Sequence, residues 1–168
     1  DAGSRPIKII RFFFVKQKTK NVTTAIVDSF PSPFCKEIRN RRAKVLRSIA
    51  KIGYNSTKEV YYYGVKISVA VTETGFPVAY VVSSPKIHDV QLLETLVNEA
   101  SVSQILGDKG YISGSIQEKI AQKGVTVTTP LRKNMKGADK TNDTLLSKRR
   151  KKIETVFSSL EKLGIQDF

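Results

Sequence analysis

Cysteine and histidine are scarce in this sequence, which contains one residue of each, Cys35 and His88. A single cysteine excludes an internal disulfide framework and any zinc site built on several cysteines. A single histidine with no partner motif argues against a histidine-based metal site or a catalytic triad. The chemistry of this chain must therefore be sought in other side chains.

Long hydrophobic runs are also missing, because no uninterrupted apolar stretch approaches the roughly 20 residues that a membrane-spanning helix needs. The apolar stretch at residues 7–15 is broken by charge and lacks a small-residue cleavage site, so we predict no signal peptide. We therefore expect a cytoplasmic protein with no membrane partner.

Acidic residues are few: 15 Asp and Glu stand against 29 Lys and Arg, which gives a net charge of +14. Such an excess favours a polyanionic partner, and nucleic acid fits best. A ribosome-associated basic protein is the alternative. The 168 residues suit one domain, which buries about 70% of the surface of its unfolded chain.

Apolar periodicity and turn residues predict an α/β fold, a mixed sheet with flanking helices. Three strands form a meander first, and strands then alternate with helices. We expect Pro31 and Pro33 to end the first strand after Asp28, and Asp89 to cap the first helix. The expected strands are 22–29, 61–71, 77–82, 103–108 and 125–129; the expected helices are 90–100, from 113 or 115 to 123, and 144–163; residues 35–58 are expected to be a basic loop with at most a short helix.

Three carboxylates stand out by their positions in this pattern. Asp28 and Asp108 each close an apolar run, and Glu154 lies beside the apolar stripe of the last helix. Magnesium and manganese prefer such hard oxygen ligands, and two ions can activate a nucleophile and stabilise the leaving oxygen. We therefore predict that the three side chains meet around two Mg²⁺ or Mn²⁺ ions. The alternatives are a turn role for each aspartate and an ion pair of Glu154 with Arg150.

Basic residues surround these positions and are candidates for contact with DNA. Lys109 follows Asp108, one group lies in the loop before the last helix, and another lies within the basic run 148–152 of that helix. A solvated surface is the alternative for each. The candidates are Lys109, Arg132, Lys133, Lys136, Arg149, Arg150 and Lys151.

Six short motifs occur in an order that resembles the catalytic domain of bacterial insertion-sequence transposases of the DDE class. The motifs are Ile26-Val-Asp-Ser-Phe-Pro31, Tyr62-Tyr-Gly-Val-Lys66, His88-Asp89, Gly107-Asp-Lys-Gly-Tyr111, Pro130-Leu-Arg-Lys-Asn134 and residues 149–158. The resemblance covers about residues 22–164. Arg150 matches an arginine often found four residues before the glutamate of this class, whereas Ser147 stands where a tyrosine is usual.

The resemblance implies an RNase H-like fold in which Asp28, Asp108 and Glu154 are the metal-binding catalytic residues. It also implies a DNA transposase that cleaves transposon ends with water and then transfers the freed 3′-hydroxyl to target double-stranded DNA. We expect a homodimer assembled on DNA in the bacterial nucleoid. His88 and Asp89 are expected to support the metal ligands, with local capping as the alternative for His88.

On this basis residues 22–168 are an RNase H-like catalytic domain with a basic insert at 35–58. Residues 1–21 are a basic N-terminal extension or the remnant of an upstream domain. Two other functions stay open. One is a different RNase H-like nuclease, and the other is a non-catalytic basic nucleic-acid-binding protein, such as a decayed transposase.

Overall fold

A six-stranded mixed sheet forms the centre of the computed structural model, which describes residues 22–35, 39–131, 134–135 and 144–162. The strand order is β2-β3-β1-β5-β6, and β4 also pairs with β3. Strands β1, β2, β3 and β4 pair in antiparallel fashion, whereas β5 is parallel to both β1 and β6. The strands are β1 Thr24–Pro33, β2 Lys51–Asn55, β3 Val60–Thr72, β4 Pro77–Ser83, β5 Gln104–Leu106 and β6 Thr126–Thr128.

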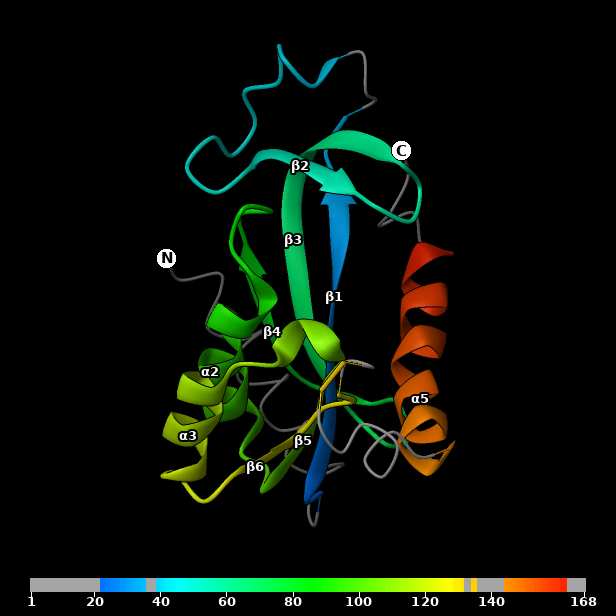
Figure 1. Ribbon diagram of the computed structural model, residues 1–168. Helices are drawn as coiled ribbons and strands as arrows, with labels where there is room; N and C mark the ends of the chain where they lie inside the picture. Colours follow the sequence, from blue (N-terminus) through cyan, green and yellow to red (C-terminus); the bar gives the residue numbers. More distant parts are fainter. Residues whose placement is uncertain (1–21, 36–38, 132–133, 136–143, 163–168) are drawn as a thin grey trace, which may run out of the picture.

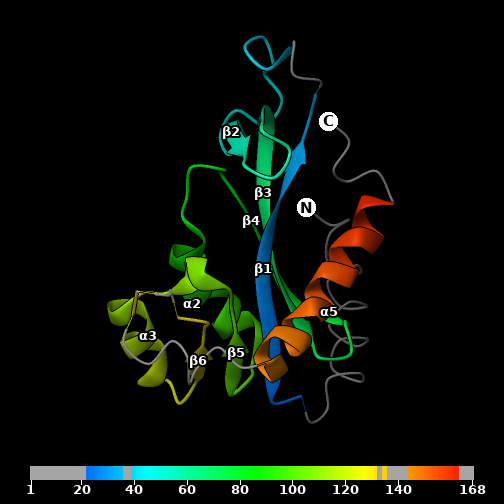
Figure 2. The same ribbon diagram turned by 45° about the vertical axis from the view of Figure 1, so that its right-hand side comes forward.

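Helices cover both faces of this sheet. Helices α2 (Asp89–Ala100) and α3 (Gly114–Ala121) lie on one face, and α5 (Thr144–Glu161) lies on the other (Figures 1 and 2). A 3₁₀ turn, η2 (Lys109–Tyr111), follows β5. The meander followed by alternating strands and helices confirms the predicted α/β class, a mixed sheet with flanking helices.

The first strand is apolar on both faces because it lies between the two helical layers. Ala25 and Val27 pack with α2 and α3, while Ile26 packs against Ile153 of α5. The side chains of Ala25, Ile26 and Val27 are fully buried. A continuous apolar run is what a strand covered on both faces requires, since successive residues point to opposite sides.

Strand β1 continues through Pro31 and Pro33, so the prediction that these prolines end it was wrong. The backbone nitrogen of Phe34 donates to the carbonyl of Tyr63 on β3 at 2.8 Å. By alternation, the nitrogens of both prolines face away from β3. On that side β5 pairs with β1 only as far as Ile26, so no ladder bond is lost among the described residues.

The basic segment 35–58 contains a strand that the sequence analysis missed. Strand β2 pairs with the start of β3, from Lys51 opposite Gly64 to Asn55 opposite Val60. Its pattern hides this role, because Lys51, Ile52 and Tyr54 are exposed on an edge strand and give no apolar alternation.

The remaining predicted elements are present within one to three residues of their expected ends, with one difference in capping. Helix α2 begins at Asp89, and His88 occupies the N-cap position without a side-chain hydrogen bond. The predicted capping role of Asp89 was therefore wrong, because its carboxylate forms an ion pair instead. Within the described part of the chain, no helix has both the length and the apolar composition to cross a membrane.

Gly64 is expected to be essential for stability, because a Cβ atom there would overlap the carbonyl oxygen of Ser32 and crowd Pro33 on β1. Gly64→Ala should lower the free energy of unfolding by about 1–3 kcal/mol, as overpacking of a rigid backbone contact does. Thermal and urea denaturation followed by circular dichroism would measure this.

Gly114→Ala is the matched control, since no atom lies within 4 Å of its added methyl group in α3. This variant should match the wild type or exceed it by up to about 1 kcal/mol. Equal losses in the two variants would contradict the strand contact.

Candidate active site

Asp28, within β1, lies level with Asp108, which follows the end of the adjacent parallel strand β5. In the β1–β5 register Ile26 is opposite Leu106. Asp28 follows Ile26 by two residues, and Asp108 follows Leu106 by two residues. Both apolar side chains belong to the cluster under α5, so alternation places both carboxylates on this face of the sheet. The sequence prediction that these two carboxylates meet is supported by this register.

Burial and charge repulsion together raise the pKa of Asp28. Removal of the carboxylate from water is the largest cause, and repulsion by Asp108 and, more weakly, by Asp89 adds to it. A hydrogen bond from the Ser29 backbone and the positive charge of Arg150 act in the opposite direction. The net effect raises the pKa of Asp28 to about 6. A positive charge beside this carboxylate would therefore favour its ionised form.

One oxygen of each aspartate is held by the backbone. The Oδ1 atom of Asp28 accepts from the amide of Ser29 at 2.8 Å, and that of Asp108 accepts from the amide of Gly110 at 2.7 Å. The second bond makes Asp108 the N-cap of η2, so the turn role considered from the sequence is present. Among the described residues no hydrogen-bond donor reaches either Oδ2 atom.

A buried hydroxyl network lies directly behind Asp28. The Oγ atom of Ser29 is 2.7 Å from that of Ser68 and 3.1 Å from the hydroxyl of Tyr111. Tyr111 is fully buried, and desolvation is the main cause that raises its pKa and keeps it neutral. These residues were missed, although Tyr111 stands in a quoted motif. Hydroxyl contacts between elements far apart along the chain leave no local sequence pattern.

A second carboxylate near the site is neutralised by a lysine of β3. The Nζ atom of Lys66 lies 2.5 Å from Oδ1 of Asp89, and their side chains are 14% and 33% exposed. Lys66 also donates to the carbonyl of Ile87. Asp89 contributes to raising the pKa of Tyr62 to about 12, after the larger effect of burial. The signal for Lys66 was that it is the single charged residue within the run 65–71.

The structure does not bring Glu154 into the group formed by Asp28 and Asp108. Ile153 anchors α5 to the sheet, and Arg150 approaches Asp28 closely enough to lower its pKa. Glu154 is exposed one turn beyond Arg150, about 6 Å further along the helix. Among the described residues there is no group of three or more Asp, Glu, His or Cys side chains that could hold a metal ion. The role of Glu154 as third ligand stays a prediction.

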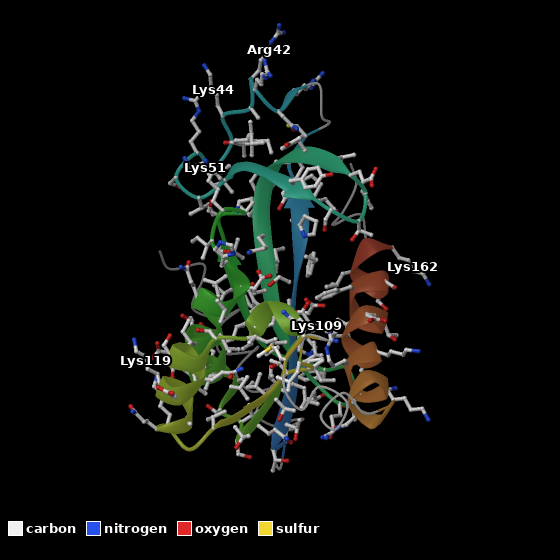
Figure 3. The ribbon with its side chains drawn as sticks, in the orientation of Figure 1. Arg42, Lys44, Lys51, Lys109, Lys119 and Lys162 are labelled. Carbon is white, nitrogen blue, oxygen red and sulfur yellow. The ribbon has the colours of Figure 1, made fainter. Side chains whose placement is uncertain are left out.

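The predicted DNA-contacting residues have different environments. Lys109 is exposed beside Asp108, as Figure 3 shows, and Lys151 is exposed on α5. Arg149 is paired with Glu73 in the β3–β4 turn. The Nε atom of Arg150 is buried and donates no hydrogen bond to a described residue. Arg132, Lys133 and Lys136 lie outside the described residues, and exposed His88 stays a predicted supporting residue.

Comparison with known proteins finds a matching family model and similar solved structures. A family model described as a transposase DDE domain matches residues 18–166. Among solved structures, the chain is similar to a piggyBac transposase in a synaptic complex with hairpin DNA, with 15% identity and a TM-score of 0.46. The similarity covers 78% of this chain and 28% of that transposase. No curated protein matches the sequence.

Asp28→Asn should stabilise the protein above pH 6. The folded-state pKa is raised from 3.8 to about 6, so ionising Asp28 destabilises the fold progressively across this interval. A shift of about two units corresponds to about 3 kcal/mol, which the amide avoids while it still accepts from Ser29. Thermal denaturation in EDTA from pH 3.5 to 8 would show the variant's advantage growing up to pH 6.

Glu118→Gln, at an exposed position of α3, removes one acidic group and serves as the control. It should follow the wild type at every pH. An Asp28→Asn advantage that does not change with pH would contradict the buried-carboxylate explanation.

Proposed function

The chain belongs to the transposase DDE domain family, and from this we propose that it is the catalytic domain of a metal-dependent DNA transposase. In this proposal Asp28, Asp108 and Glu154 are the catalytic carboxylates. The reaction is cleavage of transposon ends followed by joining of the freed 3′-hydroxyl to target DNA. The observation that carries the proposal is the level placement of Asp28, within β1, and Asp108, just after β5, on the same face of the sheet.

The chemistry of these two side chains fits a divalent cation. Transposase DDE domains generally use divalent metal ions, and Mg²⁺ or Mn²⁺ prefers carboxylate oxygens. Burial is the largest cause of the raised pKa of Asp28, and repulsion by Asp108 adds to it. We propose that Asp28, Asp108 and Glu154 would together hold two ions, which would supply Lewis acidity for in-line displacement at a phosphate.

The residues around the carboxylates have separate tasks in this proposal. Arg150 limits the repulsion at Asp28, and the Tyr111 network fixes the strand that carries it. Lys109 and Lys151 are exposed and would contact the phosphodiester backbone electrostatically. Lys66 holds Asp89 in an ion pair, so this acid does not add its full charge to the site.

Double-stranded DNA is the proposed partner, both as transposon terminal repeats and as target. The net charge of +14 favours a polyanion. We propose that two copies assemble on the DNA in the bacterial cytoplasm. These proposals concern the whole transposase, because the chain spans only 28% of the transposase of known structure to which it is similar.

One observation favours a second candidate, a DNA-binding protein of the same family without catalytic activity. Glu154 is exposed and stands apart from the paired aspartates. If it does not join them when metal and DNA are present, two carboxylates alone would hold the metal. Such a protein would bind DNA with a strong salt dependence and would not cleave it.

Metal-dependent cleavage tests these alternatives. With Mg²⁺ or Mn²⁺, the full chain should nick duplexes that carry the ends of its own element. Asp108→Asn and Glu154→Gln should each lower the rate by at least about a hundredfold, because each removes a carboxylate proposed to hold the metal ions, whose positive charge would stabilise the transition state. Glu118→Gln should retain wild-type activity. Cleavage would be followed on denaturing gels.

Thermal shifts with Mn²⁺ separate lost catalysis from lost metal binding. Manganese at about 100 times its dissociation constant should stabilise the wild type by about 2.7 kcal/mol. Asp108→Asn should lose this stabilisation. Full cleavage by Asp108→Asn would refute the assignment of Asp108 as a catalytic carboxylate. If only Glu154→Gln loses cleavage, Asp108 is dispensable.

A further inference from the structure

A basic arm, defined as residues 39–58, extends the sheet at the end away from α3. Its 20 residues include seven cations and no acidic residue: Arg39, Arg41, Arg42, Arg47, Lys44, Lys51 and Lys58. In Figure 3 Arg42, Lys44 and Lys51 are grouped at this end, whereas Lys119 lies at the opposite end. The tasks given to Asp28, Asp108 and their neighbours do not involve this arm.

Residues of the arm and of the sheet line a cavity of about 460 Å³ that is open to solvent. Four cations line it, namely Arg41, Arg47, Lys51 and Lys86, and no acidic side chain does. Within the described residues none of these four side chains forms an ion pair, although Lys51 donates to the carbonyl of Arg47. Four like charges around one space repel each other, and an anion between them removes that repulsion.

One wall of the cavity, formed by Ile52 and Tyr63, lies on the same face of the sheet as the paired aspartates, whereas alternation places Lys51, opposite Gly64, on the other face. Tyr63, which lines the cavity, alternates along β3 with residues 65, 67 and 69, and Val69 is directly opposite Asp28. Residues two apart on a strand share a face. Six residues at about 3.3 Å each place the cavity roughly 20 Å from Asp28. At about 3.4 Å per step, this separation matches about six base pairs of duplex DNA.

We propose that the basic arm is a second DNA-binding surface. Its cavity holds backbone phosphates of the duplex about six base pairs from the phosphate that reacts at Asp28 and Asp108. The chemistry recognised is the phosphodiester, without base readout, because the lining offers Arg and Lys donors in an open space. Tyr54 and Tyr61 continue this face with an exposed ring pair, 4.9 Å between centroids, which provides contact for deoxyribose.

This inference rests on the proposed function for the position of the reacting phosphate, but its test does not require cleavage. Binding of the full chain to a fluorescein-labelled 30-base-pair duplex of mixed sequence would be measured by anisotropy from 50 to 200 mM KCl. Arg47→Gln/Lys51→Gln should reduce the slope of log K against log salt by about 2, since each neutralised phosphate contributes about 0.9. Affinity at 100 mM should fall at least about tenfold.

The control is Lys119→Gln/Lys123→Gln, which removes two exposed cations at the carboxyl end of α3, of which Lys123 is paired with Glu94. Its slope and affinity should stay near those of the wild type. If the wild type binds the duplex with the expected salt dependence but does not cleave the ends of its element, the proposed function fails while the arm proposal survives.

Two results would overturn the proposal. One is an equal loss in the arm variant and the control, which would show that only total charge matters. The other is unchanged DNA binding by the arm variant with loss of binding to anionic phosphatidylserine vesicles, which would assign the arm to a membrane. Far-UV circular dichroism would establish that both double variants are folded.

Discussion

The parallel pairing of β1 with β5 is the constraint on which the candidate active site depends. Only three residue pairs make this ladder, and they bring Asp28 and Asp108 to the same level. A slip of one residue would move Asp108 to the opposite face, because side chains alternate along a strand. The ladder is protected from slipping, since Ile26 and Leu106 are buried against Ile153 while Ala25 and Ile105 pack on the other side.

The sequence was sufficient for most of the fold because the main elements are strongly patterned. The apolar run that ends at Asp28 and the hairpin of β3 and β4 are visible without tertiary information. The two errors have one physical origin. At the edge of a sheet, hydrogen bonding and burial constrain the residue type less than they do in its centre. Pro31 and Pro33 are tolerated where β1 has no second neighbour, and β2 is an edge strand with exposed side chains.

The candidate site was predictable to the extent that strands fix it. The sequence indicates Asp28 and Asp108 directly, because each closes an apolar run. The position of Glu154 depends instead on how α5 lies across the sheet. A helical pattern shows which side is apolar, and Ile153 is indeed buried. It does not show which neighbouring side chain turns inward, and in this structure that residue is Arg150. Lys66 and Tyr111 act through contacts across the sheet, which sequence spacing cannot reveal.

The two prolines of β1 have a consequence for the behaviour of the protein in concentrated solution. Beyond Ile26, one margin of this strand has no β5 partner, and such a margin normally invites strand addition from another molecule. Pro31 and Pro33 deprive it of two amide donors on that side. Self-association through a continuous intermolecular ladder is thereby discouraged, and the space above β5 stays accessible instead of being closed by a neighbouring chain.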